Sequence, residues 1–210
     1  QKGAERRRHT LIVVPAMLRK QWQQELNEKF FIPSEVLDTQ VVGRLRKNGG
    51  GNPFDQKDKA VICSYNFAAA KAAAVSQVPW DMVVIDEAHR LRNVHQNNPA
   101  AQKTMAHRIT DAVGKAPKLL LTATPLQNSL LELFSLVSVI DGHVFGDAAS
   151  FREQFINNND ELSRNFQLKQ RIAPVCTRAL RKQVTEYIPF TNRVPITQEF
   201  LPTDQEQALY

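Results

Sequence analysis

Four short runs of apolar residues recur along the chain, and polar or turn-forming residues follow each of them. They span residues 10–14 (TLIVV), 60–65 (AVICSY), 82–85 (MVVI) and 118–125 (KLLLTATP). An unbroken apolar run of this length is typical of a strand buried on both faces, as the strands of parallel sheets are. We predict four such strands, and a weaker fifth over 36–42 (VLDTQVV).

Between these runs, apolar residues recur at the spacing of an amphipathic helix. The clearest case covers 17–30, where Leu18, Trp22, Leu26 and Phe30 are four residues apart. Further helices are predicted over 67–75 with Asn66 as cap, over 97–113 before Gly114, over 130–139 and over 164–172. Strands that alternate with helices predict right-handed βαβ units, and hence an α/β fold with one parallel sheet flanked by helices.

Composition narrows the class of protein further. The 210 residues carry 27 basic and 21 acidic side chains, a net charge of +6, which favours a polyanionic partner such as nucleic acid. The two cysteines, Cys63 and Cys176, lie far apart without metal-ligand spacing, which indicates a reducing cytoplasm and no disulfide framework. No apolar run approaches the roughly 20 residues that cross a bilayer, so we expect no membrane partner.

Polar side chains gather where two of the predicted strands end. Asp86, Glu87 and His89 follow one run, and Thr122 and Thr124 follow the next. Ligands of open α/β sheets bind at the carboxyl ends of the strands. In nucleotide hydrolases a strand-end aspartate helps to hold the Mg²⁺ that bridges the β- and γ-phosphates. A carboxylate beside it can orient or deprotonate the attacking water.

These residue types also have structural explanations. Asp86 and Glu87 suit the first turn of a helix, where carboxylates favour the helix dipole. His89 is equally a capping or surface histidine, and the two threonines have high strand propensity and suit turns. The glycines at 49–51 lack the Gly-Lys-Ser/Thr ending of a phosphate loop, so we interpret them as a surface loop tip.

The two strand-end motifs together resemble those of a known family. Residues 86–93 (DEAHRLRN) and 119–128 (LLLTATPLQN) look like motif II, a DEAH box, and motif III of superfamily-two helicase-like ATPases. The string 124–136 (TPLQNSLLELFSL) is similar to Swi/Snf-type DNA translocases, which include bacterial members such as the RNA-polymerase-associated ATPase. Residues 12–15 with Gln21, Trp22 and Glu25 resemble motif Ia, and 62–65 stand where motif Ib is expected. The match covers nearly the whole chain.

This resemblance implies a RecA-like lobe of the P-loop NTPase class, with lobe 1 over 1–175 and its end and connection over 176–210. It implies ATP and Mg²⁺ as cofactors, and hydrolysis that drives movement on double-stranded DNA. It also implies the remodelling of protein–DNA complexes, with a DNA-bound protein such as RNA polymerase as target. In this scheme Asp86 holds Mg²⁺, Glu87 polarises the water, and His89 couples the nucleotide site to Thr122 and Thr124.

Several residues at element ends, most of them polar, are expected to contact the phosphates and sugars of DNA without reading sequence. They are Pro15, Arg19, Gln21, Asn66, Arg92, Asn93, Gln127 and Asn128. Solvated charges and helix starts are the alternatives, and Trp22 beside them suits core packing. A basic cluster at Arg178, Arg181 and Lys182 either braces two lobes, touches DNA or is a solvated face. Beyond it we predict a strand over 193–200 and a helix that starts at Thr203.

The family's Walker A loop and its second lobe with arginine fingers are not found in this sequence. We therefore expect the chain to begin just after that loop and, alone, to hydrolyse ATP negligibly, because the backbone cradle and lysine for the phosphates are missing. Two alternatives stay open. One is a motor subunit of a restriction or repair system, and the other is a non-catalytic nucleic-acid docking module.

Overall fold

A computed structural model describes residues 9–47, 49–92, 104–124, 129–158 and 160–178. The chain divides into two compact units, 1–175 and 176–210, and the second is described only at 176–178. The start of the helix expected at 97 and the strand and helix expected after 193 lie outside the described residues.

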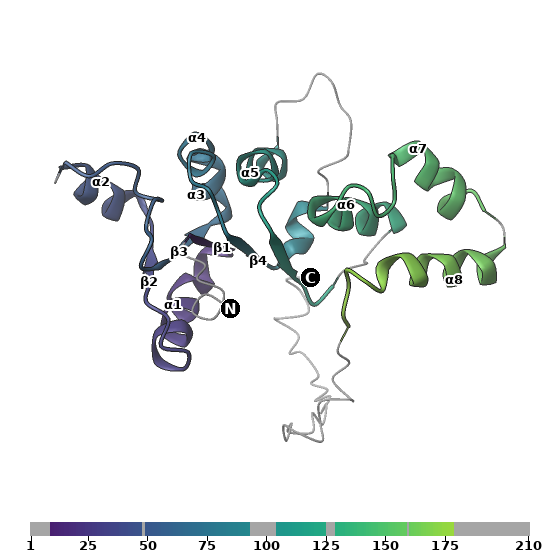
Figure 1. The fold of residues 1–210 in the computed structure, drawn as a ribbon, viewed down its shortest axis with the longest axis horizontal. Coiled ribbons are helices and arrows are strands. Elements are labelled where there is room, and N and C mark those ends of the chain that lie inside the picture. The colour runs from purple at the N-terminus through teal and green to yellow at the C-terminus, as the bar shows by residue number, and fades with distance from the viewer. Residues whose placement is uncertain (1–8, 48, 93–103, 125–128, 159, 179–210) are drawn as a thin grey trace, which may run out of the picture. The chain divides into compact units, whose positions relative to one another are not determined.

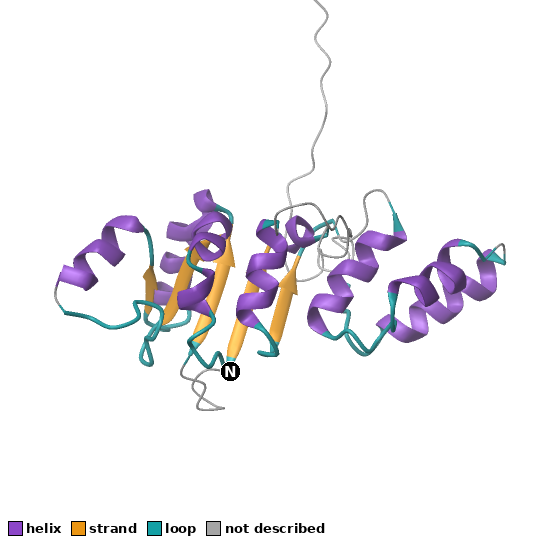
Figure 2. Ribbon diagram, turned by 90° about the horizontal axis from the view of Figure 1, so that it is seen from above, coloured by secondary structure: helices purple, strands orange, loops and turns teal. Residues whose placement is uncertain are grey.

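The first unit contains one five-stranded sheet in the order β2-β3-β1-β4-β5 (Figure 1). All the strand pairs are parallel, which confirms the predicted sheet. Figure 2 shows the strands pointing the same way, so their carboxyl ends share one edge. The strands are β1 (Thr10–Val14), β2 (Ser34–Val36), β3 (Ala60–Ser64), β4 (Met82–Asp86) and β5 (Lys118–Leu121).

The strand predicted over 36–42 is wrong. β2 ends at Val36, and helix α2 covers Thr39–Lys47. Asp38 starts this helix because its Oδ1 atom accepts a hydrogen bond from the main-chain N–H of Val41 at 2.9 Å. Val42 is then buried on one face of the helix. Valines at both strand and helix spacing made the sequence ambiguous here.

Helices cover both faces of the sheet (Figure 1). Alternate residues of the central strands face opposite layers, which explains why their sequences are apolar without interruption. Ile12, Val14 and Ile62 pack with side chains of α1, and Leu11, Val13 and Val61 belong to the core on the other face. The covering elements are η1 (Ala16–Leu18) and α1 (Arg19–Glu28) on one face, and α3 (Tyr65–Ala70), α4 (Ala72–Val75) and α5 (Met105–Val113) on the other.

One predicted helix boundary changes, and another is confirmed. Ser64, not Asn66, caps α3, because its Oγ atom accepts from the N–H of Phe67 at 3.3 Å. The helix therefore begins at Tyr65, which the sequence placed at the end of the strand. Gly114 ends α5 as predicted, with a left-handed φ of 51° that suits glycine.

A second apolar cluster lies in the chain after β5. Its elements are α6 (Leu130–Ile140), α7 (Ala148–Phe151), the π-helix η3 (Arg152–Ile156) and α8 (Glu161–Ile172). The rings of Phe134, Phe145, Phe151 and Phe155 form its centre, with centroids 4.9 to 6.2 Å apart. Among the described residues, no helix combines the length and apolar character needed to cross a membrane.

Candidate functional site

The chain turns sharply where β4 ends. Glu87 adopts a left-handed backbone conformation, with φ 54° and ψ 46°. For a residue with a Cβ atom this conformation costs on the order of 1 kcal/mol and persists only where the surroundings hold it. Here the N–H of Glu87 donates to the Oδ1 atom of Asp86 at 2.9 Å. The short helix η2 (Ala88–Leu91) follows at once and carries His89.

Asp86 is held from three directions. The indole Nε1–H of Trp22 donates to its Oδ2 atom at 2.9 Å, and the N–H of Glu87 donates to its Oδ1 atom. The hydroxyl of Tyr65 donates to its main-chain oxygen at 2.6 Å. A carboxylate accepts about four hydrogen bonds in all, so both oxygens keep acceptor capacity for a cation or its water. The side chain therefore has a fixed direction and remains able to bind.

His89 connects the ends of β4 and β5. Its Nδ1 atom lies 3.1 Å from the Oε2 atom of Glu87 and 3.4 Å from the Oγ1 atom of Thr122. The main-chain N–H of Thr124 donates to the same Thr122 oxygen at 3.2 Å, while the Thr124 side chain is exposed. The predicted site residues of the two strands therefore meet at one edge of the sheet.

Tyr65 is a site residue that the sequence analysis missed. It is buried, and the guanidinium of Arg90 lies over its ring, 5.7 Å from the centroid. Burial raises the pKa of the Tyr65 hydroxyl well above its ordinary value of 10.0; Arg90 opposes the rise, and Asp86 and Glu87 add to it. The hydroxyl therefore stays a donor at neutral pH. In the sequence, the only sign of this role was the position of Tyr65 directly after β3, which pairs with β1.

The described residues expected to contact nucleic acid follow the carboxyl ends of the strands. Gln21 on α1 and Asn66 on α3 are exposed. Arg19 is half-buried, and its Nε–H donates to the carbonyl of Ala16 at 3.0 Å. Pro15 is buried at the turn after β1, so its ring shapes the chain at this edge.

Arg92 follows η2 and faces a helix of the second apolar cluster. Its Nε atom lies 4.0 Å from the Oε1 atom of Glu132 on α6. Asn93, Gln127 and Asn128 lie outside the described residues, as do Arg181 and Lys182. Arg178 is exposed.

The donor set suits a magnesium ion better than a metal held by protein alone. In the part of the chain that the structure describes, no group of three or more His, Cys, Asp or Glu side chains has the arrangement of a metal site. Mg²⁺ in nucleotide sites is bound by one or two carboxylates, with waters and phosphate oxygens completing its octahedron. Asp86, with both oxygens fixed and acceptor capacity left, fits that role.

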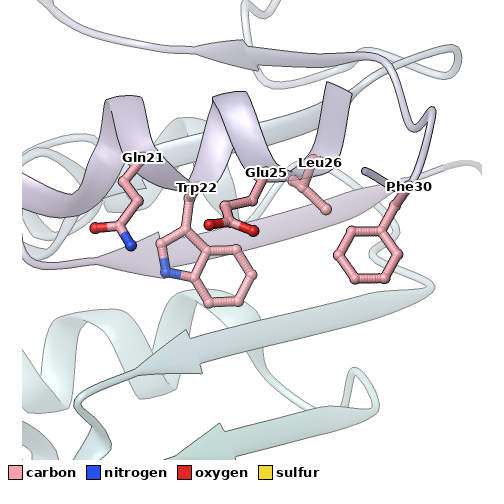
Figure 3. A pocket seen from close by; sticks show the side chains of 5 residues that line it. All are labelled: Gln21, Trp22, Glu25, Leu26 and Phe30. Atoms are coloured by element: carbon pink, nitrogen blue, oxygen red, sulfur yellow. The ribbon is translucent and has the colours of Figure 1, made fainter. Parts of the chain in front are cut away.

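A pocket of about 310 Å³ opens beside the site on the α1 face (Figure 3). It is lined by Gln21, Trp22, Glu25, Leu26 and Phe30, whose side chains extend from and just beyond α1 (Figure 3). The sheet face becomes more exposed toward β5, since Ile12 is 3% exposed but Leu119 is 47% exposed. These two residues share a register row through Val84. The described helices of this face thus stop short of the β5 side.

The parallel sheet with helices on both faces has the arrangement of a RecA-like lobe. The SWI2/SNF2 ATPase core of Sulfolobus solfataricus, solved in complex with dsDNA, shares this fold. Its TM-score is 0.62 at 21% identity, over 82% of this chain and 34% of that chain.

The sequence identifies the family. The SNF2-related domain matches residues 1–210, so the chain belongs to that family, as its motifs predicted. It is 33% identical over 202 residues to the uncharacterized ATP-dependent helicase YqhH of Bacillus subtilis (strain 168), covering 95% of this chain and 32% of that protein. It is 31% identical over 153 residues to the CHD3-type chromatin-remodeling factor PICKLE of Arabidopsis thaliana, covering 69% of this chain and 10% of that protein. The chain thus spans about a third of YqhH and less of PICKLE.

Proposed function

We propose that the full-length protein is a DNA-dependent ATPase that moves along duplex DNA and remodels protein–DNA complexes. In this proposal, residues 1–175 form the first RecA-like lobe and 176–210 lead toward a second lobe. The observation that carries the proposal is the meeting of Asp86, Glu87, His89 and Thr122 at one sheet edge. Relatives described as an ATP-dependent helicase and a chromatin-remodeling factor support it, as does a fold neighbour solved with dsDNA.

Each side chain has a role in this proposal. A bound Mg²⁺ would supply positive charge that neutralises the phosphates of ATP. Asp86 would hold this ion through the acceptor capacity that its carboxylate oxygens keep. Glu87 orients the attacking water and accepts its proton, and its carboxylate is held in place by His89 at 3.1 Å. Thr122 and Thr124 transmit changes at the nucleotide site from the end of β4 to the end of β5, through His89.

Duplex DNA would bind along the same edge of the sheet. Arg19, Gln21, Asn66 and Arg92, with Asn93, Gln127 and Asn128, would contact phosphates and sugars without reading sequence. The net charge of +6 supports a polyanionic partner. A DNA-bound protein such as RNA polymerase is the proposed target of remodelling, and the cytoplasm is the proposed location.

A triplex-displacement assay tests this function in the full-length protein. A motor that moves along duplex DNA displaces a third strand in an ATP-dependent manner, and the D86N variant should not. DNA binding without ATP-dependent displacement would favour the docking module instead. Displacement accompanied by cleavage or modification of the DNA would favour the restriction or repair motor.

A further inference from the structure

The indole of Trp22 joins helix α1 to the acidic strand end. Its Nε1–H donates to the Asp86 Oδ2 atom at 2.9 Å, across 64 positions of sequence. We propose that Trp22 is a positioning residue, which fixes the direction of the Asp86 carboxylate and couples α1 to the magnesium site. This inference rests on the role proposed above for Asp86.

The Trp22 ring is itself held firmly enough to act in this way. It packs with Leu18 and Leu26 of the same helical face against the cluster that contains Ile12 and Val14. Packing on one side fixes the ring plane, and Figure 3 shows the ring extending from α1 over the sheet. An indole N–H can only donate a hydrogen bond, whereas a water molecule in its place could turn and accept one.

The hydrogen bonds to the two carboxylate oxygens come from different parts of the chain. Trp22 fixes Oδ2 from α1, while the N–H of Glu87 fixes Oδ1 from the strained turn after β4. Groups that orient a metal ligand in this way commonly change metal affinity about 10- to 100-fold when they are lost. Loss of the indole donor should therefore weaken magnesium binding and leave the chemistry at saturating magnesium largely intact.

The same helix carries two of the proposed DNA contacts. Arg19 and Gln21 lie three residues and one residue before Trp22 on α1. A shift of α1 on binding DNA would move the indole and therefore the carboxylate. Because coupling between two binding sites is reciprocal, magnesium at Asp86 would also change the affinity for DNA by the same factor.

The variant that isolates this bond is W22F in the full-length protein, since it keeps an aromatic ring and removes only the donor and part of the ring. Trp80 offers a matched control: it is buried and donates its indole N–H to the carbonyl of Val75 at 2.9 Å, so W80F loses the same group elsewhere. Thermal melting confirms that each variant is folded at the assay temperature.

The first readout is the magnesium dependence of DNA-stimulated ATP hydrolysis. W22F should raise the half-saturating Mg²⁺ concentration about tenfold and change the maximal rate by less than about twofold, whereas W80F should match the wild type. Duplex DNA should lower the half-saturating Mg²⁺ concentration of the wild type but not that of W22F. Equal magnesium curves for W22F and an active wild type would overturn the inference while leaving the proposed ATPase function intact.

The second readout does not depend on activity. In full-length protein labelled with 5-fluorotryptophan, the fluorine resonance missing from W22F belongs to Trp22. It should shift when Mg²⁺ and ADP are added, and the shift should be lost in D86N. A Trp22 resonance that does not shift when Mg²⁺ and ADP are added would contradict the inference. An inactive wild type that still shows the shift would contradict the proposed function alone.

Discussion

The Nδ1 atom of His89 lies 3.1 Å from the Oε2 atom of Glu87, directly beyond the end of β4. The same nitrogen lies 3.4 Å from Thr122, which follows β5. One imidazole thus touches the side chain proposed to orient the attacking water and the neighbouring strand end. A change at either strand end can pass to the other through this ring.

If His89 joins these ends, its loss and the loss of the Thr122 hydroxyl should affect the same step. We expect H89A and T122V each to lower kcat about tenfold with little change in KM, and the double variant to be no slower than the slower single variant. Steady-state kinetics of the full-length protein measures this cycle. H143A, at an exposed histidine on another loop, is the control. Effects that multiply would show that the two side chains act independently.

The buried Tyr65 hydroxyl should stabilise the lobe. The Y65F variant leaves the main-chain oxygen of Asp86 without this donor, so we expect a loss of about 1–3 kcal/mol in the free energy of unfolding. Denaturant titration at neutral pH measures this loss. A variant as stable as the wild type would show that water replaces the hydroxyl without cost.

The raised pKa of Tyr65 also predicts a pH dependence with a definite sign. The folded state holds the phenolic proton more tightly than the unfolded state does. The hydroxyl therefore makes its full contribution to the free energy of unfolding at pH values below the ordinary tyrosine pKa of 10.0. Above that pH the unfolded chain loses the proton first, and the free energy of unfolding falls by up to about 1.4 kcal/mol per pH unit. The difference between wild type and Y65F should therefore shrink from pH 10 upward. A constant difference would contradict the assignment.

The two free cysteines should differ strongly in reactivity. Burial in β3 raises the pKa of the Cys63 thiol to about 12, despite the opposing effect of Arg19, whereas Cys176 is exposed. Because the thiolate is the reactive form, a thiol reagent should label Cys176 quickly and Cys63 only after unfolding. Mass spectrometry of the labelled peptides distinguishes them. Fast labelling of Cys63 in native protein would mean that β3 is not a stable central strand.

Arg19 provides a direct test of the proposed DNA edge. We expect R19A to weaken duplex binding similarly for all sequences and to reduce the salt slope of the affinity by about 1. K115A is the matched control, because Lys115 is exposed in the turn before β5, at the opposite edge of the sheet. Fluorescence anisotropy at several salt concentrations measures both slopes. Equal effects of R19A and K115A would indicate diffuse attraction to the net charge.

Local patterns were sufficient to predict the sheet and its acidic end. The apolar run before Asp86 and the polar residues after it are readable without coordinates, because burial on both faces leaves no other pattern for a central parallel strand. The strand prediction failed after Val36, because the valines there fit both a strand and a helix. The hydrogen bond from the N–H of Val41 to Asp38 shows that this segment begins a helix.

The contacts of Trp22 and Tyr65 with Asp86 could not be predicted in this way. They depend on the strand order, in which β1 lies between β3 and β4 and brings distant segments to one edge. Sequence periodicity fixes strands but not the order in which they pair. The packing alternative for the Trp22 ring and a role at the site are compatible, because the ring packs while its N–H reaches the carboxylate.

Glu87 is proposed to serve ATP hydrolysis at this edge of the sheet. The most direct measurement is the rate of ATP hydrolysis by full-length wild type and E87Q, with and without duplex DNA. We predict a wild-type rate that DNA stimulates, and an E87Q rate lower by about 10²- to 10⁴-fold with ATP binding retained. An E87Q variant that hydrolyses ATP as fast as the wild type would contradict the assignment, and a wild type without DNA-stimulated hydrolysis would contradict the proposed function.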